Sequence, residues 1–115
     1  MERDLKERTK AFALRVIRLY SRLPKTTVAQ VMGKQVLRSA TSVGANYREA
    51  DEGRSKAEFI AKMGDSLREL SETEYWLELL IESGTTKPEA MPPLLEETRQ
   101  LKAIFSTIIR KARSA

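Results

Sequence analysis

The chain has 115 residues and a formal net charge of +5, with 41% hydrophobic and 32% charged residues, a composition typical of one globular domain with a single core. It contains no cysteine and no histidine. This excludes disulfides, thiolate metal sites and the Ser-His or Cys-His nucleophile pairs, and with them most hydrolase mechanisms. We therefore expect a non-enzymatic protein without a cofactor.

The opening residues 1–8 are mostly charged, and no apolar run of the sequence approaches membrane-spanning length. We expect neither a signal peptide nor a membrane partner, and we expect a cytoplasmic protein. The first and last quarters of the chain are basic, whereas the third quarter is acidic. A basic balance of this kind is compatible with nucleic acid or another anionic partner.

The first two helices are read from apolar residues at helical spacing. One is predicted over residues 4–23, because Pro24 disfavours helical geometry at the residue before it. The next is predicted over residues 27–52. It begins at a capping box from Thr27 to Gln30 and ends before Gly53, which is well placed as a left-handed residue.

The third helix is predicted over residues 55–83, with a capping box from Ser55 to Glu58 and Gly84 as its terminator. The fourth is predicted over 92–113, after a short turn over 87–91, because an earlier start would place two prolines inside it. Short loops make consecutive helices antiparallel neighbours. The sequence therefore predicts an all-α, up-down-up-down four-helix bundle forming one domain over residues 1–115.

The helix over 27–52 has a narrow apolar face. The helix is thin because it carries small side chains, so neighbouring backbones can approach it closely. These residues are Ser39, Ser42, Gly44 and Ala45. Because Gly44 weakens an isolated helix by about 1 kcal/mol relative to alanine, packing against neighbours must compensate.

Several segments resemble a known family of bacterial four-helix bundles. They are Leu19-Tyr20, Leu23-Pro24-Lys25, Ser42-Val-Gly-Ala-Asn-Tyr-Arg-Glu-Ala50, then Ser55, Phe59, Lys62, Glu69, Glu72 and Tyr75-Trp-Leu-Glu-Leu79. Together they cover nearly the whole chain, and they look like the proteins encoded in intervening sequences of 23S ribosomal RNA genes. The ribosomal-RNA branch usually reads Asn-Ile-x-Glu-Gly where this chain has Asn46-Tyr-Arg-Glu-Ala50, which suggests a sister branch.

The resemblance implies a left-handed bundle and homo-oligomers, which are ring-shaped pentamers in some members. It also implies a role connected with nucleic acid. The accessory protein of diversity-generating retroelements, which works with a reverse transcriptase and RNA, is similar in fold to this family.

Two helices carry the candidate nucleic-acid-binding residues. On the helix over 4–23, cations fall in a narrow band beside the apolar stripe, and the helix over 92–113 adds more. Arginine side chains suit phosphate, and if the two helices are neighbours their cations could form one basic surface. The alternative is a solvated face that aids solubility, because no aromatic residue is interleaved to stack on bases. The candidates are Arg8, Arg15, Arg18, Arg22, Lys25, Arg99, Lys102, Arg110 and Arg113.

A candidate oligomer interface lies on the helix over 55–83. Trp76 and Leu79 fall roughly opposite its core stripe, so the C-terminal half of this helix is apolar on two sides. A second apolar face on a small domain usually marks an interface, and we expect self-association there. The alternative is that a wide bundle, or the loop over 84–93, covers Trp76 internally.

Glu74 falls in the core stripe of the same helix, where a buried carboxylate needs a partner such as Arg38, Arg48 or an arginine of the helix over 4–23. A metal-binding interpretation of the glutamates is disfavoured, because di-iron bundles use Glu-x-x-His pairs and this chain has no histidine. The sequence therefore favours a homo-oligomeric bundle that binds RNA, DNA or a nucleic-acid-processing partner. The alternative is a protein-protein interaction scaffold with no nucleic-acid binding.

Overall fold

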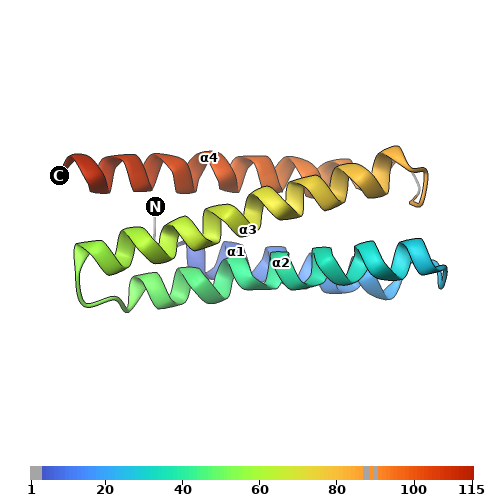
Figure 1. The fold of residues 1–115 in the computed structure, drawn as a ribbon, viewed down its shortest axis with the longest axis horizontal. Coiled ribbons are helices and arrows are strands. Elements are labelled where there is room, and N and C mark those ends of the chain that lie inside the picture. The colour runs from blue at the N-terminus through green and yellow to red at the C-terminus, as the bar shows by residue number, and fades with distance from the viewer. Residues whose placement is uncertain (1–3, 87–88, 90) are drawn as a thin grey trace.

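The computed structural model describes residues 4–86, 89 and 91–115 and contains four long helices. They are α1 (Leu5–Ser21), α2 (Thr27–Asp51), α3 (Lys56–Glu82) and α4 (Pro92–Ser114). The helix bounds lie within two residues of those expected from the sequence, whereas the turn expected over 87–91 falls partly outside the described residues. The molecule is a rod of 47 × 19 × 19 Å, in which α1 lies behind α2 and α3 runs obliquely between this pair and α4 (Figure 1).

Ion pairs and hydrogen bonds show that consecutive helices run antiparallel. Between α1 and α2, Lys6 pairs with Asp51 and the Tyr20 hydroxyl contacts Gln30. Between α2 and α3, Arg38 pairs with Glu72 and Glu49 with Lys62. The α3–α4 seam follows the same pattern, with Glu78 bonded to Arg99 and Glu74 to Lys102. The predicted all-α four-helix fold is confirmed, and its left-handed twist stays a prediction.

The core is filled by side chains from all four helices. Phe12 of α1, Leu77 of α3 and Phe105 of α4 are each at most 1% exposed. The rings of Tyr47 on α2 and Phe105 on α4 meet edge to face with their centroids 5.8 Å apart. Because α2 and α4 lie on a diagonal of the bundle, this aromatic pair ties its two halves together at the centre.

Helix ends follow the capping signals in part. Ser55 caps α3 by accepting a hydrogen bond from the Glu58 amide, and Gly84 ends it with a φ of 72°, as predicted. Two other expectations are wrong. The α2 cap is Thr26, one residue earlier than Thr27, because the Thr26 hydroxyl already satisfies the Ala29 amide. Gly53 does not adopt a left-handed conformation.

Small residues bring α2 close to both of its neighbours. A Cβ atom on Gly44 would lie 3.1 Å from the Thr9 hydroxyl oxygen of α1, which is tighter than an ordinary contact, so Thr9 would have to shift to accept even a methyl group. On the opposite side, the hydroxyl oxygens of Ser39 and Thr73 lie 2.7 Å apart, and the Ser66 hydroxyl donates to the Val43 carbonyl of α2 at 2.8 Å. The slender α2 predicted from the sequence is therefore packed tightly between α1 and α3.

This close packing predicts opposite effects at two helical glycines. Gly44→Val should lower the free energy of unfolding by about 1–3 kcal/mol, because its methyl groups must displace α1. Gly64→Ala should raise it by up to about 1 kcal/mol, because nothing lies within 4 Å of the added Cβ and alanine is the better helix former. Urea unfolding followed by circular dichroism measures both. A fully stable Gly44→Val protein would show that α1 and α2 are further apart.

Candidate nucleic-acid interface

The structure does not bring the nine predicted basic residues together on one surface. It divides them into three groups, according to whether acidic side chains lie beside them and at which end of the bundle they are found. The groups are the ion-paired residues Arg8, Arg99 and Lys102; the residues at the C-terminal end of α1, namely Arg15, Arg18 and Arg22 with Lys25 just beyond the helix; and Arg110 and Arg113 at the C-terminal end of α4.

Arg8 is neutralised across the seam between α1 and α4. Its guanidinium donates to both carboxylate oxygens of Glu97, at 2.8 and 2.9 Å, and also to Gln100. Such a two-pronged bond between arginine and a carboxylate is among the stronger polar contacts in proteins. Arg8 therefore holds α4 against α1 and offers little charge to an external phosphate.

Arg99 and Lys102 are neutralised by α3. Arg99 donates to Glu74 at 2.8 Å and to Glu78 at 2.9 Å, and the Lys102 ammonium donates to Glu74 at 2.6 Å. Glu74 is thus paired, as the sequence requires, but with α4 and not with the three partners that the sequence suggested. Hydrogen bonds from Lys102 and then Arg99 hold the pKa of Glu74 below its usual value.

The other glutamates weighed as metal ligands, Glu69 and Glu72 of α3 and Glu49 of α2, also form ion pairs. Arg38 bonds to Glu69 at 3.2 Å and to Glu72, and Lys62 bonds to Glu49 of α2 at 2.8 Å. Within the part of the chain that the structure describes, no group of three acidic side chains is placed to hold a metal ion. The same residues include no helix long and apolar enough to span a membrane.

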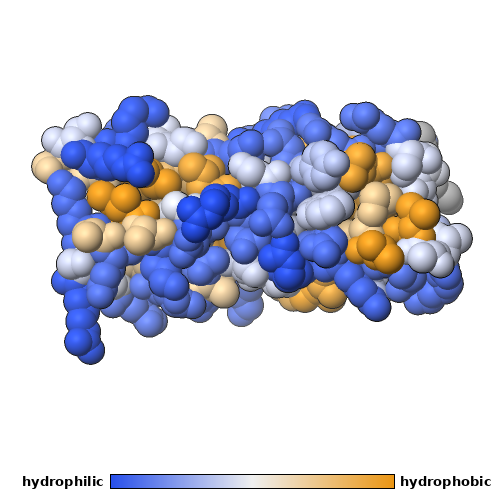
Figure 2. Space-filling model, viewed as in Figure 1, coloured by the Kyte–Doolittle hydropathy of each residue, from blue (hydrophilic) through white to orange (hydrophobic). Residues whose placement is uncertain are grey.

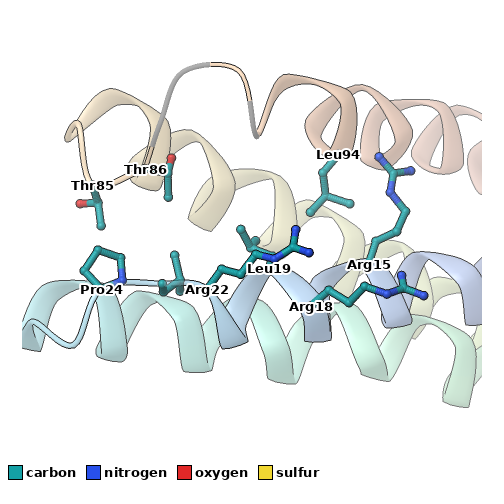
Figure 3. A pocket seen from close by; sticks show the side chains of 9 residues that line it. Arg15, Arg18, Leu19, Arg22, Pro24, Thr85, Thr86 and Leu94 are labelled. Carbon is teal, nitrogen blue, oxygen red and sulfur yellow. The ribbon is translucent and has the colours of Figure 1, made fainter.

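Arg15, Arg18 and Arg22 lie together and have no acidic partner among the described residues, as is also true of Arg110 and Arg113; we call the three α1 residues the α1 arginine cluster. The three side chains recur every three or four residues along the last turns of α1 and line a pocket beside the start of α4 (Figure 3). The Arg15 side chain extends from α1 toward α4 near Leu94. Arg110 and Arg113 lie at the opposite end of the bundle, because α1 and α4 are antiparallel.

A second surface lies on α2 and α3 near the C-terminal end of α3. Val28, Val31 and Tyr75 are each 55–56% exposed, whereas Trp76 and Leu79 are half-buried. The antiparallel register set by Ser39 and Thr73 brings Leu79 level with Val31. Figure 2 shows hydrophobic side chains gathered at this end of α2 and α3. We call Val28, Val31, Tyr75 and Leu79 the α2–α3 patch.

Trp76 agrees in part with each of the two interpretations made from the sequence, an oligomer interface and a side chain covered inside the bundle. Its ring packs against the core and against Tyr75, with ring centroids 5.3 Å apart, and its indole N–H is buried without a hydrogen-bond partner among the described residues. Val28, Val31 and Tyr75 form the exposed part of the surface and were not predicted. The signal was present, because Val28 and Val31 lie one turn apart and outside the apolar stripe of α2.

Four long helices around one apolar core, joined by ion pairs across their seams, define a small helical-bundle protein. The model of the 23S rRNA-intervening sequence protein family matches residues 2–107, so the chain belongs to that family. A protein with unknown function from the S23 ribosomal protein family of Bacteroides thetaiotaomicron is 40% identical, with 91% of this chain and 97% of that chain covered and a TM-score of 0.85. No curated protein was found to match. Similarity to the retroelement accessory protein stays a prediction.

The Glu74 pairs predict a specific dependence of stability on pH. In the folded protein the pKa of Glu74 lies below its ordinary value of about 4.5. The stabilisation by the Glu74 ion pairs is therefore complete above the ordinary pKa and is lost as the pH falls through the pKa of the folded state. Glu74→Gln should therefore lower the free energy of unfolding by about 1 kcal/mol near neutral pH and by much less in strong acid. Urea unfolding at several pH values measures this, with exposed Glu82→Gln as control. An equal deficit at every pH would contradict it.

Proposed function

We propose that this protein is a cytoplasmic, non-enzymatic homo-oligomer that binds nucleic acid through the α1 arginine cluster. The observation that carries the proposal is that three neighbouring arginines have no acidic partner among the described residues. Elsewhere in the molecule, ion pairs join the facing helices. Guanidinium groups that are already free can bind phosphate without first breaking a pair inside the protein.

Further cations extend the proposed surface. Lys25 follows the cluster in the exposed loop between α1 and α2, and Arg110 and Arg113 provide a second basic area at the other end of the rod. Arg8, Arg99 and Lys102 are left out, because each is bonded to a carboxylate. Contacts of this kind read the phosphate backbone and not the base sequence, so binding should depend strongly on salt and weakly on sequence.

The names of related proteins support a connection with RNA. The family is named for intervening sequences of 23S rRNA, and the similar solved structure is assigned to a ribosomal protein family. An enzyme that processes nucleic acid is the alternative partner, in place of the nucleic acid itself.

Self-association is supported by the α2–α3 patch. Val28, Val31 and Tyr75 are more than half exposed, and Leu79 and Trp76 continue the surface inward. A closed ring, such as the pentamer implied by the family resemblance, would repeat the α1 arginine cluster around its axis. Repetition raises avidity without requiring any single strong site.

The α2–α3 patch also favours a second candidate function, a scaffold whose partner is another protein. Its apolar side chains are suited to a protein surface and carry no charge for phosphate. The two functions respond differently to salt: phosphate contacts weaken steeply as ionic strength rises, whereas an apolar interface hardly changes.

The proposed nucleic-acid function predicts an effect of the α1 arginine cluster on RNA binding. Reversing the charges of Arg15, Arg18 and Arg22 together to glutamate should weaken binding of a labelled single-stranded RNA by tenfold or more. It should also reduce the slope of log affinity against log salt by about 2, because about three phosphate contacts are lost. Fluorescence anisotropy at several salt concentrations measures both quantities.

The matched control changes Lys34, Arg48 and Arg54 to glutamate. These residues are exposed on α2 and the turn after it, and the change in net charge is the same. The control variant should bind RNA far more tightly than the α1 variant. Equal losses in both would mean that overall charge, and not the α1 arginine cluster, governs binding.

The second prediction concerns assembly. Light scattering should give a multiple of the 13.1 kDa chain mass for the natural protein and a single chain mass for Val31→Lys/Tyr75→Lys. Both side chains are exposed, so their replacement should leave the fold intact, whereas Trp76→Ala would also open the core. The control is Leu14→Lys/Ile17→Lys on α1, which should keep the natural mass. A monomeric natural protein would refute the proposed oligomer.

A further inference from the structure

The pocket beside the α1 arginine cluster has two chemically different ends. It has a volume of about 520 Å³ and lies between the last turns of α1, Thr85 and Thr86 after α3, and Leu94 of α4. Figure 3 shows the guanidinium groups of Arg15 and Arg18 at one end of the pocket, with Pro24, Thr85 and Thr86 at the other. The Arg22 guanidinium lies in the middle, beside Leu19 and Leu94.

The guanidinium groups of the charged end have no acidic partner among the described residues. Glu97 of α4 is already paired with Arg8. The first turn of α4 contains no acidic residue, so the positive end of this helix adds to the field of the arginines. An anion placed here would gain charge-assisted hydrogen bonds and displace no carboxylate of the protein.

The apolar end offers hydrocarbon surface. Leu23 and Pro24 form part of its wall, and Thr86 directs its carbon atoms toward α1 and its hydroxyl oxygen away (Figure 3). The lining contains no aromatic ring on which a nucleobase could stack. This end therefore suits a saturated hydrocarbon chain better than a nucleotide.

We propose that this pocket binds a small amphipathic anion, with a carboxylate or phosphate head on the α1 arginine cluster and an apolar tail against Leu19, Leu23 and Leu94. Its volume falls in the range of small-molecule sites, about 300–1,000 Å³. Nucleic acid bound to the same arginines would leave the apolar end unused. The proposal does not depend on nucleic-acid binding or on oligomer formation.

Isothermal titration calorimetry of the full chain with sodium decanoate tests this directly. We expect one site per chain, with much weaker binding of acetate, which lacks the tail, and of 1-decanol, which lacks the charge. Decyl phosphate in place of decanoate shows which head the arginines prefer. Acetate or inorganic phosphate binding as tightly as decanoate would overturn the proposal, because the tail would then contribute nothing.

Two variants test the two ends separately. Arg15→Gln/Arg18→Gln/Arg22→Gln should weaken decanoate binding at least about tenfold, because charge-assisted hydrogen bonds are lost. Lys34→Gln/Arg48→Gln/Arg54→Gln carries the same change in net charge and should bind decanoate normally. Equal affinities of the two triple variants would overturn the assignment of the head group.

Thr86→Phe should fill the apolar end and weaken decanoate binding while all three arginines remain. Circular dichroism melting of each variant shows that it is folded. The Thr86→Phe protein should still bind single-stranded RNA, so failure of this pocket and failure of the proposed nucleic-acid function give different results. RNA binding at the arginines with no decanoate binding would overturn the pocket and leave a plain phosphate-binding surface.

Discussion

The close packing of α2 between α1 and α3 is the constraint on which the rest of the structure depends. Gly44 lets α2 approach Thr9 of α1, and the Ser39 hydroxyl meets Thr73 of α3. With α1 and α3 both held by α2, α4 packs mainly on α3 and only loosely on α1. The seam between α1 and α4 is closed by Arg8 and Glu97 near its middle and stays open beside the start of α4, where the pocket lies.

The same arrangement decides which charges are neutralised. The acids of α3 point to its two neighbours. Arg38 of α2 pairs with Glu69 and Glu72 on one side, and Arg99 and Lys102 of α4 pair with Glu74 and Glu78 on the other. α1 lies diagonally across the bundle from α3, so its arginines are beyond the reach of these carboxylates. They remain unpaired because of where the helix lies, although the chain as a whole contains sixteen acidic residues. The lack of acidic partners at the C-terminal end of α1 is therefore a consequence of helix order.

Sequence reasoning mostly succeeded where one helix is considered alone, although it placed the α2 cap one residue late and wrongly expected a left-handed Gly53. Apolar spacing located four helices, and Ser55 and Gly84 marked the two ends of α3. It failed where two helices must be placed against each other. Periodicity gives the angle of Glu74 on α3 but not which neighbour that angle faces, so its partners Arg99 and Lys102 were missed. For the same reason nine cations that share suitable faces on two helices were merged into one surface, although antiparallel packing separates their ends.

The α1 arginine cluster connects the proposed activities through one set of atoms. If an amphipathic anion occupies the pocket, its head group bonds to the guanidinium groups that would otherwise bind phosphates of a nucleic acid. By linkage the two ligands must then weaken each other by the same factor, whichever binds first. The apolar tail makes this competition selective, because an inorganic anion lacks the hydrocarbon that the walls around Leu19 and Leu94 accept. The protein would in this way respond to a small molecule without any movement of its helices, because an anion bound in the pocket changes the charge presented at one end of the rod.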